Sequence, residues 1–167
     1  RIAGKSRPMA HRHVLDVLHR SQHPLVAVER VDPYGEPELL STDPRGPQVL
    51  LRLRTTLRNQ GQALAQHVGC ELTLPRFAVT TESRRRTLDQ YQARLQQRPG
   101  KVTFFFYHPI PVFPGQSLPF TEIWIGIHGT NREHYAAGNV ALQWKVYADA
   151  ARPRQGLIPL QHYSVVQ

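Results

Sequence analysis

The stretch that decides the fold is QVLLRLRTTLRN, residues Gln48–Asn59. Apolar side chains occupy its odd positions up to Leu57, apart from Thr55, and arginine or threonine occupies the even positions from Arg52 onward. Successive side chains of a strand point to opposite faces of a sheet, so this pattern predicts a strand with one buried and one solvated face. Asn59-Gln60-Gly61 then predicts a turn.

Weaker alternation of the same kind appears on both sides of this strand and is bounded by proline and glycine. We expect the strand after the turn to be the antiparallel neighbour of Gln48–Asn59. About seven short strands without strand–helix alternation predict an all-β fold, an immunoglobulin-like antiparallel β-sandwich. The other expected strands are Leu25–Val31, His67–Leu74, a short edge strand Phe77–Thr80, Lys101–Tyr107, Phe120–His128, Asn139–Asp149 and a last partial strand Leu157–Val166.

Two segments do not fit a strand pattern. Ser6–Gln22 predicts a short N-terminal helix, capped by Ser6 and ended before Pro24, whose apolar face needs a docking surface. Ser83–Gln97 is highly charged and fits either a short helix or an excursion between strands. We therefore expect a linker and helix over 1–23, trailing an absent upstream domain, and a sandwich domain over 24–167. Arg1 is not a natural start, which favours a part of a larger protein.

Length and composition limit the classes of protein to which this chain can belong. The 167 residues fit one domain, and 40% hydrophobic residues can form a core. Cys70 is the single cysteine, so an intrachain disulfide is excluded and a reducing, cytoplasmic location is expected. No apolar run is long enough to predict a transmembrane helix or a membrane partner.

The net charge of +9, carried by 21 basic against 12 acidic residues, raises the question of nucleic acid. Alternation places three arginines of the strand 48–59 on its solvated face, and a run of three follows at 84–86. Guanidinium groups pair well with phosphate, so we treat these six as candidate nucleic-acid-binding residues. The alternative is a solvated sheet face whose charges discourage edge pairing. The candidates are Arg52, Arg54, Arg58, Arg84, Arg85 and Arg86.

Catalytic and metal chemistry have little support in the sequence. The nine histidines lack metal-ligand spacing, and Cys70 falls on the inward face of its strand. We expect no catalytic residue, no metal site, no cofactor and no enzymatic activity. A small-molecule pocket at one end of the sandwich, lined by Trp124, Tyr135 or Trp144, stays an open alternative.

Two segments resemble a known family. Arg1–Met9 with the helix through Val14–Leu18 is similar to the end of Schlafen-like, Alba-type DNA-binding (ATP-binding) domains of bacteria. Leu57–Gly61 and Ala65–Val68 resemble the Asn-x-Gly hairpin of sandwich tails attached to such proteins. The resemblance implies that a nucleic-acid or nucleotide site would lie upstream of Arg1, and it assigns no functional residue to this chain.

These observations together predict a non-catalytic accessory domain of a larger bacterial protein. Its expected role is protein interaction, assembly or sensing, with a protein partner or self-association. The alternative is nucleic-acid binding through the arginine-rich sheet face.

Overall fold

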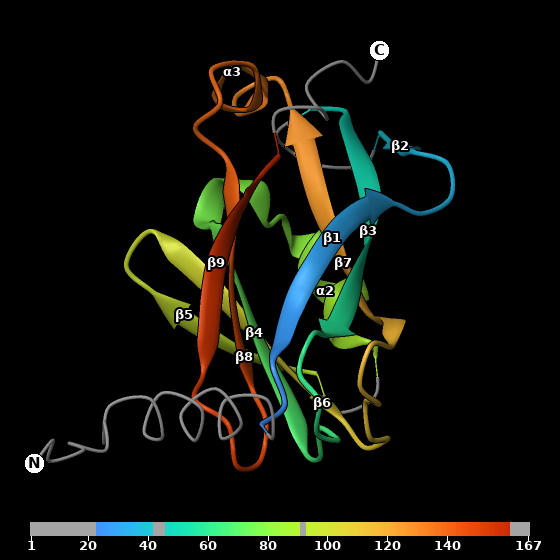
Figure 1. Cartoon of the computed structure of the whole chain (residues 1–167). Helices are drawn as coiled ribbons and strands as arrows, with labels where there is room; N and C mark the ends of the chain where they lie inside the picture. Colours follow the sequence, from blue (N-terminus) through green and yellow to red (C-terminus); the bar gives the residue numbers. More distant parts are fainter. Residues whose placement is uncertain (1–22, 42–45, 91–92, 161–167) are drawn as a thin grey trace, which may run out of the picture.

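Two antiparallel sheets pack face to face in this chain, which confirms the predicted immunoglobulin-like β-sandwich (Figure 1). A computed structural model describes residues 23–41, 46–90 and 93–160. The predicted N-terminal helix lies outside the described residues, as does the end of the last predicted strand. In the part of the chain that is described, no helix is long and apolar enough to cross a membrane.

The first sheet is built around β3 (Gln48–Asn59), whose bounds are those predicted. One edge of β3 pairs with β1 (Val26–Pro33) and β2 (Glu38–Leu40), and the other edge pairs with β7 (Ser117–His128) along almost its whole length. In Figure 1, β3 runs from the upper end of the sandwich to the lower end.

The second sheet has the strand order β5-β6-β4-β8-β9. The central strand β4 (Val68–Pro75) pairs with β6 (Lys101–His108) and β8 (Ala141–Tyr147). The outer strands are β5 (Arg94–Arg98) and β9 (Arg154–Pro159). All pairings are antiparallel, as expected from the short connections.

The expectation that the strands on either side of the Asn59 turn are neighbours was wrong. β3 and β4 belong to different sheets, and residues 60–67 carry the chain across the core from one sheet to the other. The alternation showed correctly that each strand has one buried face. The alternation does not show which strand pairs with which. In this sandwich the chain passes to the other sheet after β3, so β4 pairs with strands of that sheet.

The expected edge strand over Phe77–Thr80 was also wrong, because a 3₁₀ turn η1 (Arg76–Ala78) forms there instead. Helix α2 (Thr81–Leu88) follows, so the first part of the segment 83–97 is helical and its last part is strand β5. The helix begins in a capping box, in which Thr80 Oγ1 accepts a hydrogen bond from Ser83 N (3.2 Å) and Ser83 Oγ accepts one from Thr80 N (2.8 Å).

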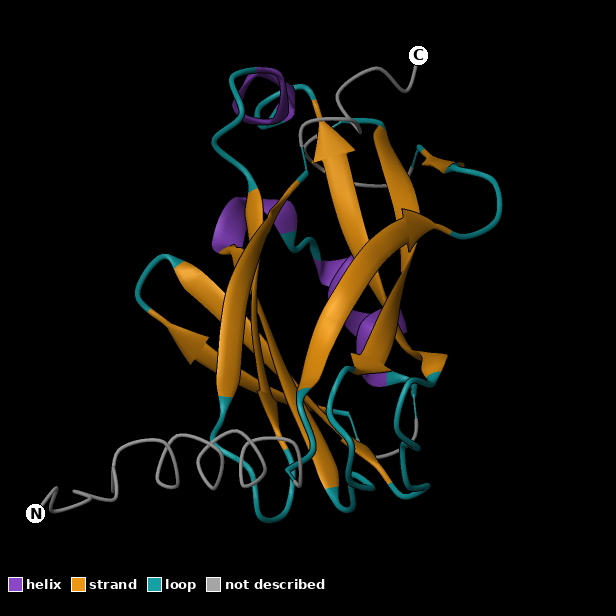
Figure 2. Ribbon diagram, viewed as in Figure 1, coloured by secondary structure: helices purple, strands orange, loops and turns teal. Residues whose placement is uncertain are grey.

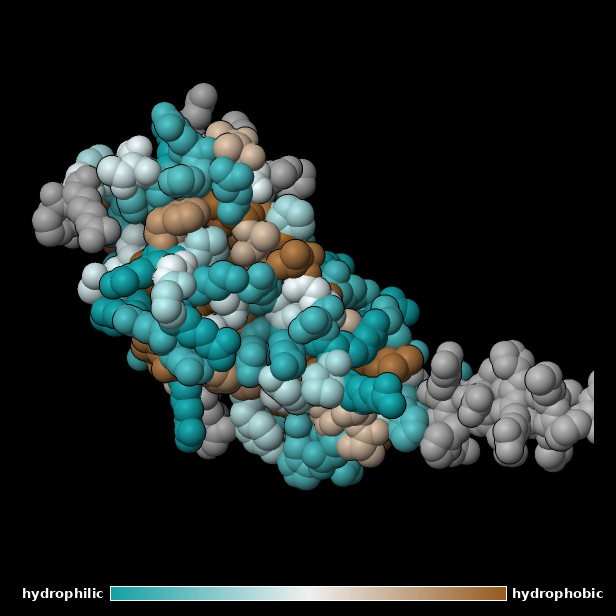
Figure 3. All heavy atoms as spheres, turned by 90° about the vertical axis from the view of Figure 1, so that its left-hand side faces the viewer, coloured by the Kyte–Doolittle hydropathy of each residue, from teal (hydrophilic) through white to brown (hydrophobic). Residues whose placement is uncertain are grey.

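A last short helix, α3 (Arg132–Ala136), lies in the polar segment between β7 and β8. The three helical segments of the described residues, η1, α2 and α3, occupy connections between strands and form no layer of their own (Figure 2). The face at the left of Figure 1 is mostly hydrophilic, with hydrophobic residues showing in small groups (Figure 3).

The core lies between the two sheets and consists of the inward residues of the alternating strands. Burying a large aliphatic or aromatic side chain contributes about 1.5–3 kcal/mol, so this alternation is what drives the sheets together. Cys70 is buried as predicted, and its burial raises the pKa of its thiol. The inward residues are Val26, Val28, Val31, Leu51, Leu53, Leu57, Ile123, Ile125 and Ile127 from the first sheet, and Val68, Cys70, Leu72, Leu74, Val102, Phe104, Phe106, Leu142 and Val146 from the second.

The outer edge of β7 is closed by side chains of helix α2 and its C-terminal neighbour. Glu122 N donates to Gln90 Oε1 (2.9 Å), and Gln90 Nε2 donates back to the Glu122 carbonyl. Two residues further along β7, Trp124 N donates to Thr87 Oγ1 (3.0 Å). Main-chain groups that would template another strand are thereby occupied, and the helix is fixed against the first sheet.

Asn131 closes the rest of the same edge. Its Oδ1 accepts a hydrogen bond from His128 N (2.8 Å), and its Nδ2 donates to the carbonyls of Gly126 (2.9 Å) and Phe77 (2.8 Å). Asn131 therefore joins the end of β7 to η1, and it is almost fully buried while doing so.

At the opposite end of the sandwich, Asn59 connects three separate chain segments. Its Oδ1 accepts hydrogen bonds from Leu25 N (3.1 Å) and Gly61 N (3.0 Å). Its Nδ2 donates to the carbonyls of Ala63 (2.8 Å) and Val112 (3.0 Å). A carboxamide has two donors and room for two acceptor bonds, so the side chain of this fully buried residue is fully used.

The main chain around Asn59 is equally constrained. Asn59 N donates to the Gln116 carbonyl (3.1 Å), and Gly115 N donates to the Asn59 carbonyl (2.8 Å). Gly61 admits no side chain, because a Cβ there would lie 2.2 Å from the carbonyl oxygen of His23. The start of β1, the loop 60–67 and the loop 109–116 are therefore held together as one unit.

We predict that Asn59→Ala lowers the free energy of unfolding by about 3 kcal/mol, because it leaves several buried main-chain groups without partners. Asn59→Asp keeps the acceptor and loses both donated bonds, so it should also destabilise the chain. Urea denaturation measures both effects, with Gln62→Ala in the same loop as an exposed control expected within about 0.5 kcal/mol of the wild type. An Asn59→Ala chain as stable as this control would contradict the role of Asn59.

Candidate functional site

Arg52 and Arg54 share one carboxylate on the outer face of the first sheet. Arg52 Nε donates to Glu122 Oε2 (2.6 Å), and Arg54 Nη2 lies 3.2 Å from Glu122 Oε1. The guanidinium carbon of Arg54 lies 3.5 Å from the ring centroid of Tyr34, and that of Arg52 lies 5.1 Å from the ring of Trp124. Both arginines are thus held by an anion and an aromatic face.

Arg58 is also paired, with Glu29 of the neighbouring strand β1. Arg58 Nη1 lies 3.2 Å from Glu29 Oε1. Hydrogen bonds from Ser117 and from Arg58 hold the pKa of Glu29 below its ordinary value. The predicted solvated arginine face therefore exists, but each of its three arginines has a carboxylate partner.

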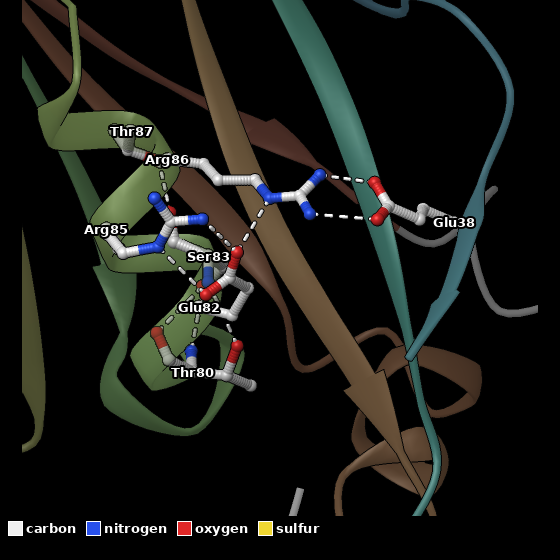
Figure 4. Close-up of polar contacts among 7 residues, drawn as sticks. All are labelled: Glu38, Thr80, Glu82, Ser83, Arg85, Arg86 and Thr87. Carbon is white, nitrogen blue, oxygen red and sulfur yellow. Dashed lines mark hydrogen bonds and ion pairs between the residues drawn. The ribbon is translucent and has the colours of Figure 1, made fainter. Parts of the chain in front are cut away.

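Arg85 and Arg86 of helix α2 converge on the carboxylates of Glu82 and Glu38 (Figure 4). Glu82 receives Arg85 through Nε (3.0 Å) and Nη2 (2.5 Å), and Arg86 through Nε (3.0 Å). These hydrogen bonds, that of Arg85 foremost, lower the pKa of Glu82 to about 2. The Arg86 guanidinium also forms a two-pronged pair with Glu38, with Nη2 at 2.8 Å from Oε1, and lowers the pKa of that carboxyl.

The Arg86–Glu38 pair explains where α2 lies. Glu38 belongs to β2, on the far edge of β3 from β7, so this ion pair spans the outer face of the sheet. Leu50 points outward from β3, yet it is only 1% exposed. Two of the three arginines in the run 84–86 are therefore neutralised by carboxylates.

Arg84 is the exception among the six candidates. It has no ion pair with any described residue, and it lines a cleft of about 1080 Å³ beside the start of α2. Arg76, on η1, lines the same cleft and also has no carboxylate partner in the described ranges. Arg76 gave no signal in the sequence, because it stands alone after Pro75, outside any arginine run.

Two further hypotheses from the sequence concern the histidines and an aromatic pocket. Within the described residues, no group of three His, Cys, Asp or Glu side chains lies close enough to hold a metal ion. Trp124, Tyr135 and Trp144, which the sequence suggested as the lining of a pocket, do not line the cleft of about 1080 Å³. Tyr135 is fully buried, with its hydroxyl donating to the Gly126 carbonyl (3.4 Å), while Trp144 packs against Gly156.

Comparison with known proteins adds little to this geometry. No family model matches the chain, and no curated protein matches its sequence. Among solved structures, the chain is similar to the crystal structure of a β-D-glucoside glucohydrolase from Trichoderma reesei. That likeness has 14% identity and a TM-score of 0.29, and it covers 95% of this chain and 24% of the other. It carries no argument, and the Schlafen-like resemblance stays a prediction.

We predict that the ion pairs of Glu82 make stability depend on acid pH. The pKa of Glu82 is lower in the folded chain than its ordinary value of 4.5, so the stabilisation is complete above about pH 5 and is lost as the pH falls toward 2. The difference in free energy of unfolding between the wild type and Glu82→Gln should amount to at most about 1 kcal/mol near neutral pH, because exposed pairs are screened, and it should shrink below pH 4.5.

Denaturation of both chains across this pH range measures the effect. Glu36→Gln serves as the control, since Glu36 is exposed and has no ion pair among the described residues. A constant difference between the wild type and Glu82→Gln from neutral pH to pH 2 would rule out the pairing.

Proposed function

We propose that this domain is a non-catalytic interaction module that contacts a protein partner through the loop end of the sandwich. The observation that carries the proposal is a loop-end apolar cluster, which we define as Leu25, Leu64, Ile110 and Phe113. Their exposed fractions are 41%, 37%, 63% and 59%. Large apolar side chains kept in water at one end of a domain are typical of a protein-binding surface.

The cluster is exposed because of how its loops pair. Ala65 and Val112 form an isolated antiparallel bridge, with hydrogen bonds of 3.0 and 2.9 Å, and both are fully buried. Their flanking residues Leu64 and Phe113 point the other way, since side chains alternate across an extended pair. The apolar exposure is therefore a consequence of the backbone pairing in these loops.

Asn59 holds this cluster in place. Its side chain bonds the main chain of Leu25 itself, of Ala63 next to Leu64, and of Val112 next to Phe113. The loop 109–116 also contains three prolines, which restrict its backbone. A surface fixed before binding loses little conformational entropy on association, which favours a recognition role.

The proposal also covers the cellular location of the module and the kind of protein that contains it. A single buried, reduced cysteine suits the cytoplasm, and a sandwich of this size suits an accessory domain of a larger bacterial protein. Nucleic-acid binding through Arg52, Arg54, Arg58, Arg85 and Arg86 is less favoured, because phosphate would have to compete with Glu122, Glu29, Glu82 and Glu38 for them.

We predict that the double variant Ile110→Ser/Phe113→Ser folds normally and loses protein association, since both side chains are already solvated. The matched control is Leu39→Ser/Leu157→Ser, which removes two side chains of similar exposure (72% and 62%) elsewhere on the chain. Light scattering over a concentration series measures self-association, and cross-linking to proteins of a bacterial lysate measures other partners.

The proposal expects association by the wild type and the control and none by the Ile110→Ser/Phe113→Ser chain. A wild type that stays monomeric and forms the same cross-links as the double variant would overturn it.

A further inference from the structure

The cleft beside α2 lies at the opposite end of the sandwich from the loop-end apolar cluster. Its floor is formed by Gln48 and His128, register partners at the ends of β3 and β7. Its walls come from η1, from the start of α2 and from the turn between β5 and β6 at Gly100. A volume of about 1080 Å³ exceeds that of many small-ligand pockets and accommodates a ligand the size of a nucleotide.

Two arginines without a carboxylate partner among the described residues line this cleft from different elements. Arg76 comes from η1 and Arg84 from the second turn of α2, one turn after Thr80, whose carbonyl accepts a hydrogen bond from Arg84 N (2.9 Å). Elsewhere in the described chain, arginines of β3 and α2 are bound to carboxylates. Arg76 and Arg84 therefore keep donors that the fold itself does not use.

The carboxylate in the cleft lining does not cancel this charge. Glu82 is turned toward Arg85 and Arg86, neither of which lines the cleft. Its low pKa keeps it ionised, and its charge is already balanced by these two partners. The cleft thus faces solvent with an excess of positive charge.

Further positive charge surrounds the β5–β6 turn. Arg98 and Lys101 are register partners on either side of it, and neither has a carboxylate partner within the described ranges. Arg76 N donates to the Gly100 carbonyl (3.0 Å), which brings η1 against the same turn. Like charges held together without counter-ions raise the local potential and attract an anion.

The remaining lining suits a ligand that is anionic at one end only. Phe77 lines the cleft, and its ring stacks on that of His134 with ring centroids 4.5 Å apart, so the lining includes an aromatic side chain held by a second ring. The hydroxyl of the exposed Thr81 adds a polar group near Arg84.

From these features we infer that the cleft binds a phosphate-bearing ligand, with Arg76 and Arg84 holding the phosphate. Planar guanidinium groups pair with phosphate oxygens through two parallel hydrogen bonds, which gives both strength and orientation. The inference is independent of the loop-end apolar cluster, and it relocates any nucleotide or nucleic-acid contact from the sheet face to the cleft.

The test is titration of the full chain with two probes, ATP and a fluorescein-labelled ten-nucleotide oligothymidine, at low salt. Arg76→Gln and Arg84→Gln should each raise the Kd by about tenfold, the loss expected for one charge-assisted pair. Arg52→Gln is the matched control, because its guanidinium is bound to Glu122, and it should leave the Kd within about twofold. Circular dichroism and urea midpoints verify that all three variants fold.

Each outcome decides the inference. Binding of ATP alone would show that the ligand is a free nucleotide-type phosphate, and binding of the oligonucleotide alone would show that it is a phosphodiester backbone. Either result supports the inference if Arg76→Gln and Arg84→Gln weaken the binding. In both cases the amide signal of Gly100 should shift in a nitrogen–proton correlation spectrum. No binding of either probe, or weakening by Arg52→Gln without weakening by Arg84→Gln, would overturn the inference.

Discussion

The hydrogen bonds that fix helix α2 against the first sheet decide most of what this molecule presents to solvent. Thr87 and Gln90 occupy main-chain groups of β7, and Arg86 reaches across to Glu38 on the other side of β3. The helix consequently closes the outer edge of β7. Its start, together with η1, forms one wall of the cleft.

The same placement of α2 separates arginines that are bound to carboxylates from arginines that are not. Arginines on the sheet face and on the exposed side of α2 are bound to carboxylates, with Arg52 and Arg54 sharing that of Glu122, so their charge is partly or fully offset. Arg76 and Arg84 line the cleft and have no carboxylate partner among the described residues, so their charge is not offset. The net charge of the whole chain says nothing about this division, which depends on local helix pairs as well as on the tertiary arrangement.

How much of this was predictable differs from element to element. The bounds of β3 followed from period-two alternation, because burial of one face is a local property of the strand. That β3 and β4 lie in different sheets did not follow, since the alternation does not encode the pairing partner. Glu82 lies three and four residues before Arg85 and Arg86, which is the spacing of ion pairs along a helix. The sequence therefore indicated that Glu82 offsets the charge of these arginines. Glu122 gave no such sign, because its approach to Arg52 and Arg54 depends on the register between β3 and β7.

The division of arginines into bound and free groups is the central claim, and exchange of their Nε hydrogens with water tests it most directly. Nuclear magnetic resonance of the arginine side chains measures this rate residue by residue. The account predicts slow exchange for Arg52, Arg85 and Arg86, whose Nε groups donate to Glu122 or Glu82, and fast exchange for Arg76 and Arg84. Equal rates for the two groups would contradict it.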